Sequence, residues 1–67
     1  MKKYKASEMT LVGYDRDNDK VWTASDGNTF VTGRNGTASD AAGQGSRLPG
    51  HMSLKDYAYG PITKRPK

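Results

Sequence analysis

The sequence contains no cysteine and only one histidine, His51. The lack of cysteine excludes disulfides, thiolate zinc sites and cysteine nucleophiles, and one histidine excludes a multi-histidine metal site within a single chain. Asp40, Ser46 and His51 supply the residue types of a hydrolase triad, but a triad needs a rigid scaffold with an oxyanion hole. A 67-residue chain with a flexible loop offers neither. We therefore predict a protein that is not an enzyme and that holds no metal or cofactor.

Large apolar side chains are also scarce, because Leu, Ile, Val and Phe together supply only eight residues. A chain this short buries about 60% of the surface that its unfolded form exposes, so we expect one small domain over residues 1–67. A protein partner or a second copy, forming a homo-oligomer, would complete its core. The basic N-terminus is followed by no apolar run, and no stretch approaches membrane-spanning length. The expected location is therefore the cytoplasm, without membrane association.

The formal net charge of +4 is concentrated at the two ends of the chain. The N-terminal tail (1–5) and the C-terminal tail (63–67) hold six of the eleven basic residues: Lys2, Lys3, Lys5, Lys64, Arg65 and Lys67. The remaining five bases stand against seven acids, so the body between the tails carries a charge of −2 (5 − 7). The tails are candidate phosphate contacts, whereas the body does not have the charge of a nucleic-acid groove.

The order of apolar and turn residues predicts a small, mostly-β or α+β fold. Runs rich in strand formers, at about 8–14, 20–25 and 29–33, are separated by turn signals and predict a three-stranded antiparallel meander. A long Gly-rich loop over 34–50 and a short helix over 53–59 follow. A small SH3-like barrel is the alternative, since it also joins short strands through long polar loops.

The hairpin between the second and third strands has two alternative registers. Its turn signal is "DGN" at 26–28, because Gly and Asn tolerate the positive φ that tight hairpin turns need. A three-residue loop places Trp22 and Phe30 on the same face of the sheet, whereas a two-residue turn places Trp22 opposite Val31. In either register Trp22 anchors the core.

The helix expected at 53–59 depends on a capping pattern. Ser53 is followed three residues later by Asp56, which resembles a capping box with Asp in place of Glu, and Gly60 ends the segment. The competing interpretation is a last edge strand over 56–62, which would place Tyr57 and Tyr59 on one face.

The acidic segment "DRDNDKVWTASD" at 15–26 partly matches the pattern of a calcium-binding loop. Asp15, Asp17 and Asp19 take the first ligand positions, but Lys20 stands where the sharp turn requires glycine. Asp and Asn dominate turns for local hydrogen-bonding reasons. We therefore interpret the segment as a plain turn.

The sequence features that remain favour recognition over catalysis. Long loops without secondary structure are uncommon in compact domains and are often functional. We predict a small non-enzymatic interaction protein, a regulator or inhibitor, that binds a protein partner through a sheet edge, an aromatic face and the 33–50 loop. Its candidate anchors are Arg34, Arg47, Tyr57 and Tyr59. The alternative is a nucleic-acid-binding protein that uses the basic tails for phosphates and the tyrosines for base stacking.

Overall fold

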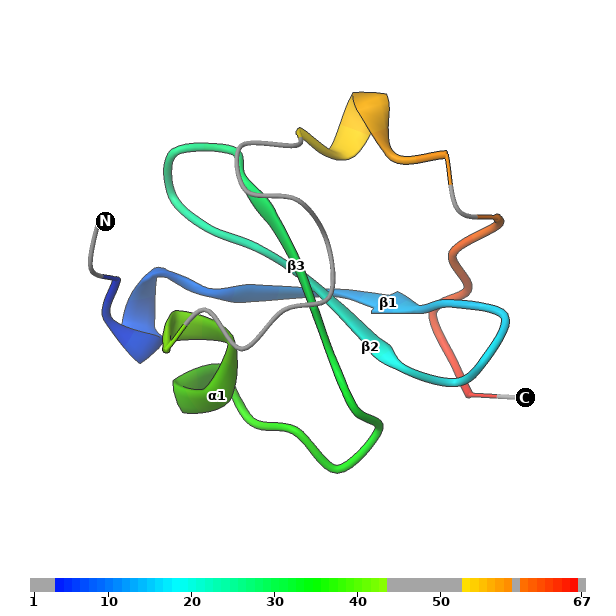
Figure 1. Ribbon diagram of the computed structural model, residues 1–67, viewed down its shortest axis with the longest axis horizontal. Helices are drawn as coiled ribbons and strands as arrows, with labels where there is room; N and C mark the ends of the chain where they lie inside the picture. The colour runs from blue at the N-terminus through cyan, green and yellow to red at the C-terminus, as the bar shows by residue number, and fades with distance from the viewer. Residues whose placement is uncertain (1–3, 44–52, 59, 67) are drawn as a thin grey trace.

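The computed structural model describes residues 4–43, 53–58 and 60–66. Its centre is an antiparallel sheet in the order β1-β2-β3, which confirms the small α+β meander. Figure 1 shows α1 beside the N-terminal η1, whereas η2 lies at the opposite end of the view. The described residues hold three strands and no SH3-like barrel. The elements are η1 (Ala6–Glu8), β1 (Thr10–Tyr14), β2 (Lys20–Thr23), β3 (Thr29–Thr32), α1 (Ala38–Ala42) and η2 (Leu54–Asp56).

The turn between β1 and β2 is organised by the carboxylate of Asp15, which is only 2% exposed. Its Oδ1 accepts hydrogen bonds from the N–H groups of Asp17 at 2.9 Å and Asp19 at 3.0 Å. Asn18 has a φ of 65°, a left-handed conformation that asparagine adopts more readily than most residues. The acidic segment is thus a turn closed by its own backbone. Among the described residues, no group of three or more acidic or histidine side chains could hold a metal ion.

The β2–β3 hairpin has a three-residue loop, at 25–27. The Ala24 N–H closes it by donating to the Asn28 carbonyl oxygen at 2.9 Å, and Gly27 supplies a φ of 91°. Trp22 therefore pairs with Phe30. This register places both rings on one face, as the three-residue alternative predicts, although the loop begins one residue earlier than "DGN".

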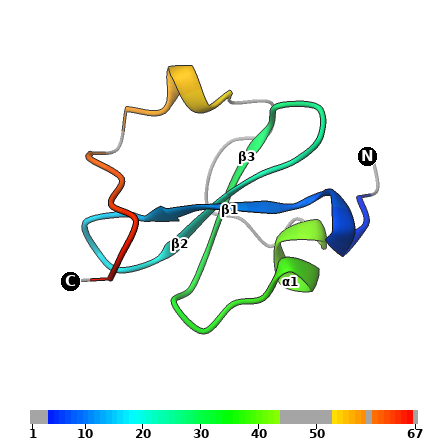
Figure 2. The same ribbon diagram turned by 180° about the vertical axis from the view of Figure 1, so that it is seen from behind.

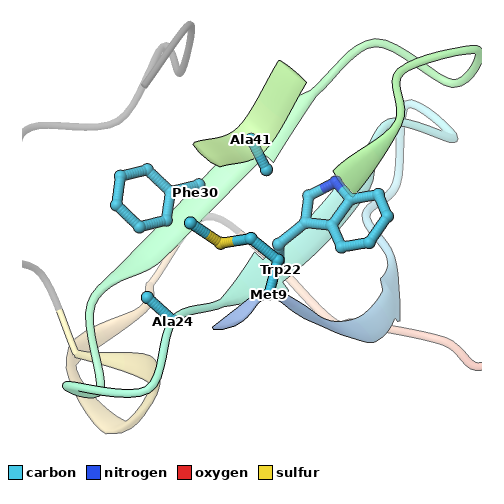
Figure 3. Close-up of a cluster of buried hydrophobic side chains, with 5 residues drawn as sticks. All are labelled: Met9, Trp22, Ala24, Phe30 and Ala41. Atoms are coloured by element: carbon cyan, nitrogen blue, oxygen red, sulfur yellow. The ribbon is translucent and has the colours of Figure 1, made fainter. Parts of the chain in front are cut away.

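The main core lies on the face of the sheet that carries these two rings. Its buried members are Met9, Trp22, Ala24, Phe30 and Ala41, from η1's C-terminal cap, β2, the β2–β3 hairpin and α1. Figure 3 shows the Met9 thioether between the Phe30 and Trp22 rings, with the Ala41 methyl group approaching from α1. Full burial of a large apolar side chain contributes about 1.5–3 kcal/mol. The three large side chains therefore dominate this core.

Hydrogen bonds satisfy the polar groups at the margin of the main core. The Trp22 indole N–H donates to Thr32 Oγ1 at 2.9 Å. The Tyr4 ring makes an edge contact with Phe30 at a centroid distance of 5.3 Å, and its hydroxyl donates to Asp26 Oδ2 at 2.5 Å. Tyr4 thereby ties the start of the described chain to the hairpin loop.

The second face of the sheet is buried as well. Val21 and Val31 pair across β2 and β3, and their side chains are 0% and 2% exposed. Because successive strand residues point to opposite faces, these valines lie on the side opposite Trp22. The sheet is therefore covered on both sides, although the chain has few large apolar residues.

The prediction of an irregular loop over 34–50 is wrong for the described residues 34–43, because they contain the helix α1. Thr37 caps this helix: its Oγ1 accepts from the Asp40 N–H at 3.3 Å, while Asp40 Oδ2 accepts from the Thr37 N–H at 2.8 Å. The helix buries only alanine on the sheet, with Ala41 fully inaccessible. Its apolar face therefore carries no large residue that would mark it in the sequence. Residues 44–50 of the predicted loop lie outside the described residues.

The helix predicted at 53–59 is also too long, because η2 is a single 3-10 turn, Leu54–Asp56. Ser53 Oγ donates to Asp56 Oδ2 at 2.8 Å and makes no hydrogen bond to a backbone N–H of the turn. Tyr57 already has extended dihedral angles, φ −67° and ψ 120°. Without a backbone cap, the turn does not continue into an α-helix.

Candidate binding surface

β1 is an edge strand whose outer side, in the described part of the chain, is unpaired along most of its length. Among the described residues, β1 pairs with β2 and, at Tyr14 alone, with the C-terminal segment. Thr10 and Leu11 are exposed, and Leu11 is one of two large hydrophobic residues exposed in the described chain. We call the outer side of β1, from Thr10 to Tyr14, the β1 edge. Edge strands present backbone N–H and C=O groups to which another chain can pair.

The C-terminal strap, residues 60–66, is seated at the far end of the β1 edge. The Tyr14 N–H donates to the Thr63 carbonyl oxygen at 2.7 Å, and the Thr63 N–H donates to the Tyr14 carbonyl oxygen at 2.8 Å. Figures 1 and 2 show the strap running from the side of η2 to the end of β1 nearest the turn into β2. The strap forms one antiparallel bridge, at Thr63, just outside the edge strand over 56–62 that is the alternative interpretation of the sequence. The described residues of 56–62 form no strand.

The strap approaches β1 so closely that only glycine fits at position 13. A Cβ atom built on Gly13 would overlap the Thr63 carbonyl oxygen and would lie 2.9 Å from Ile62 Cγ2. Gly13 follows a bulge in β1 and pairs with Val21. We call the space over Gly13, which Ile62 and Thr63 fill, the Gly13 notch.

Pairing between the strap and β1 stops immediately after Thr63. The Thr63 hydroxyl donates to the Arg65 carbonyl oxygen at 2.7 Å, and the chain bends at 64–65. Pro66 has no N–H to donate. Lys64 and Arg65, two of the predicted phosphate contacts, are exposed just beyond the paired residue. They lie next to the β1 edge.

Two of the predicted anchors, Arg34 and Tyr57, lie within the described residues, and they belong to different parts of the fold. Arg34 is exposed at the tip of a turn in which the Gly36 N–H donates to the Gly33 carbonyl oxygen at 2.8 Å. This β3–α1 connection lies at the bottom of Figures 1 and 2, whereas η2, which precedes the half-buried Tyr57, lies at the top. The structure therefore separates the described anchors.

Several of the predicted contacts cannot be placed. Lys5 is exposed at the start of η1. The other predicted anchors and phosphate contacts lie outside the described residues: Arg47, Tyr59, Lys2, Lys3 and Lys67.

Opposite charges balance within the described residues. All seven acids and seven of the eleven bases lie there, for a formal charge of zero (7 − 7). The described part of the chain therefore has no excess of positive charge for phosphate. Five of these acids accept hydrogen bonds within their own turns or helix ends: Glu8, Asp15, Asp26, Asp40 and Asp56.

Sequence reasoning did not identify the β1 edge or the Gly13 notch. The available signal was a glycine inside a strand pattern, which often marks a bulge or the close approach of another backbone. Nothing in the spacing shows that residue 63 belongs to the approaching segment, because it lies 49 positions (63 − 14) after Tyr14.

The comparisons with known proteins identify no relative of this chain. No protein-family model matches it, and neither does a curated protein or a solved structure. In the part of the chain that the structure describes, no helix has the length and apolar character to span a membrane. The function is therefore inferred from the geometry of the chain itself.

Proposed function

We propose that this protein is a small, non-enzymatic binding protein that recognises a protein partner by adding a strand of the partner to the β1 edge. The observation that carries the proposal is the pairing of Tyr14 with Thr63, because an extended segment already occupies one position of this edge. In such strand addition, main-chain hydrogen bonds give affinity and flanking side chains give specificity. A regulatory or inhibitory role on a larger partner fits a chain of this size.

Two features beside the edge supply specificity. Leu11, 41% exposed, offers an apolar contact in the middle of the edge. Lys64 and Arg65 place two exposed positive charges where the paired region ends. Complementary charges steer encounter and fix register, so a partner segment with an acidic flank is favoured.

Nucleic-acid binding through the basic tails is the competing outcome. The described residues are electrically balanced, so they supply no net attraction to phosphate, and binding would depend on individual exposed bases and on the four bases outside the described residues. Such binding would weaken steeply with salt.

The test begins with peptides selected from a random display library against the full chain. A matched pair of leucines provides the control, since Leu11 and Leu54 are 41% and 38% exposed but only Leu11 lies on the β1 edge. Leu11→Lys should weaken the selected peptides about tenfold or more, because a charge on an edge strand opposes pairing, and Leu54→Lys should not. Equal effects of the two substitutions would contradict the proposal.

Amide spectra of the ¹⁵N-labelled chain locate the binding. Peptide-induced shifts at Thr10, Leu11 and Val12 support strand addition. Shifts at Lys5, Lys64 and Arg65 caused by a single-stranded oligonucleotide, lost at high salt, would favour the nucleic-acid function.

A further inference from the structure

We infer that the partner strand enters the Gly13 notch and replaces the C-terminal strap. The inference rests on the proposed function and names the chemistry of the partner segment. That segment is extended, and it carries a β-branched apolar residue directly before the residue that pairs with Tyr14. The chain's own Ile62 and Thr63 have this pattern and occupy these positions.

The shape of the notch selects the β-branched residue. Ile62 Cγ2 lies 2.9 Å from the position that a Cβ on Gly13 would take, so its branch methyl fills the space left by the missing side chain. Glycine inside a strand is destabilising relative to alanine, because it loses more conformational freedom on folding. The notch is thus maintained against the local preference of a strand. A segment with alanine in place of isoleucine would lose the contacts of this methyl group and leave only the backbone of the next residue over Gly13.

The strap is held weakly enough to be replaced. Its bridge to β1 consists of two backbone hydrogen bonds, and each such bond contributes little net stability because water competes for the same groups. Pairing ends at Thr63, so the strap leaves the edge at Thr10 and Leu11 unused. A partner strand that continues past the notch makes additional hydrogen bonds that the strap does not make.

The strap nevertheless sets a threshold for binding. Because it is tethered, it competes at an effective concentration that is on the order of millimolar for short flexible links. A partner segment must therefore bind the β1 edge more favourably than the tethered strap does. Short or poorly matched segments are therefore rejected, although the β1 edge is exposed.

The first experiment releases the strap in the full-length chain. In the double variant Ile62→Ala/Thr63→Pro, alanine removes Cγ2 and proline removes the N–H that bonds Tyr14. The probe is a synthetic peptide, acetyl-Gly-Pro-Ile-Thr-Lys-Arg-Pro-Lys-amide, which repeats residues 60–67. It should bind the double variant at least about tenfold more tightly than the wild-type chain, because the internal competitor is gone. The same peptide with alanine in place of isoleucine should bind about tenfold more weakly than the original.

A second substitution shows whether the notch itself is the binding site. Gly13→Ala, added to the double variant, should abolish peptide binding because its Cβ occupies the notch. Gly33→Ala is the matched control, since a Cβ there meets no atom within 4 Å, and it should leave binding unchanged. If the double variant keeps a dispersed amide spectrum but does not bind the peptide, the inference is overturned. Equal binding of the isoleucine and alanine peptides would overturn it as well.

Hydrogen exchange in the wild-type chain tests the release of the strap without any variant. The Tyr14 and Thr63 amides should exchange at least about tenfold faster than those of Trp22 and Phe30, because local opening needs less free energy than global unfolding. Equal rates would mean that the strap opens only when the whole chain unfolds, and would overturn the inference.

The selected peptides separate this inference from the function on which it rests. If they respond to Leu11→Lys but not to Gly13→Ala, a strand binds the β1 edge without entering the notch, and only the inference fails. If neither substitution affects them, the proposed function fails.

Discussion

The tetrapeptide Thr-Ala-Ser-Asp occurs twice in this chain, at 23–26 and at 37–40, and it folds in two different ways. The first copy ends β2 and enters the hairpin loop, whereas the second caps and begins α1. The aspartate accepts a backbone hydrogen bond in both copies. Asp26 Oδ1 accepts from the Asn28 N–H ahead of it at 3.1 Å, and Asp40 Oδ2 accepts from the Thr37 N–H behind it at 2.8 Å.

The residue that directly follows each copy, Gly27 or Ala41, accounts for the difference. Gly27 has a φ of 91°, which interrupts any helix and turns the chain back into β3. Ala41 in the second copy extends the helix and is fully buried against the main core. The aspartate of the shared tetrapeptide therefore supplies a hydrogen-bond acceptor for a backbone N–H, either in a hairpin loop or at the start of a helix. The flanking residues and the core decide whether the loop or the helix forms.

The largest predicted effect comes from removing the core contact of the second copy. Ala41→Asp would place a carboxylate among Met9, Trp22 and Phe30, and burying an unpaired charge should cost about 3 kcal/mol or more. This is a large part of the stability of so small a domain. Circular dichroism during urea unfolding should show loss of the cooperative transition. The exposed neighbour Ser39→Asp is the control, and an equal effect of the two substitutions would show that core packing does not hold α1.

The next effect concerns the residue that makes the first copy turn. Gly27→Ala should destabilise the chain by about 1–2 kcal/mol, because a side chain is strained at positive φ. Gly33→Ala, which meets open space at an ordinary φ, should change the urea midpoint far less. Similar midpoints for both variants would contradict the role assigned to Gly27.

Removing the cap of the second copy should have a smaller effect. Thr37→Ala deletes the oxygen that accepts from the Asp40 N–H, at an expected cost of about 1 kcal/mol. Thr37→Ser keeps that oxygen and should retain most of the stability. Urea midpoints of the two variants provide the measurement, and a serine variant as unstable as the alanine variant would argue against capping.

The smallest effect is expected at the hydroxyl group that holds the first copy. Tyr4→Phe keeps the ring on Phe30 and removes the hydrogen bonds to Asp26 and Asn28, for a loss of about 0.5–1 kcal/mol. A double-mutant cycle with Asp26→Ala should show a coupling energy of similar size. Strictly additive effects would mean that the Tyr4–Asp26 contact does not stabilise the hairpin.

The sequence predicted the parts of the fold that depend on short-range patterns. The three strands follow from β-branched and aromatic runs between turn residues, and the face shared by Trp22 and Phe30 follows from strand alternation in one of the two registers considered. The helix α1 was missed because its buried residue is an alanine, which gives no amphipathic signal. Ser53 and Asp56 resembled a cap, but they bond to each other instead of to the backbone.

The candidate site was less accessible to sequence reasoning, for a different physical reason. A sheet edge was expected to bind a partner, but the sequence does not show that the C-terminal strap lies against one end of β1. Only the structure shows that position 13 requires glycine, because the steric conflict comes from Ile62 and Thr63, which lie over it. Arg34 and Tyr57 were grouped by residue type, whereas the fold places them on separate elements.

The burial of Trp22, whose indole N–H donates to Thr32, makes this chain its own optical reporter. Trp22 is the only tryptophan, and it is buried in the main core, so its fluorescence emission reports on that core alone. Emission should shift to the red when the core unfolds and water reaches the indole. Release of the strap from Tyr14 and Gly13 should leave the emission maximum in place, so a red shift indicates unfolding of the core and not release of the strap.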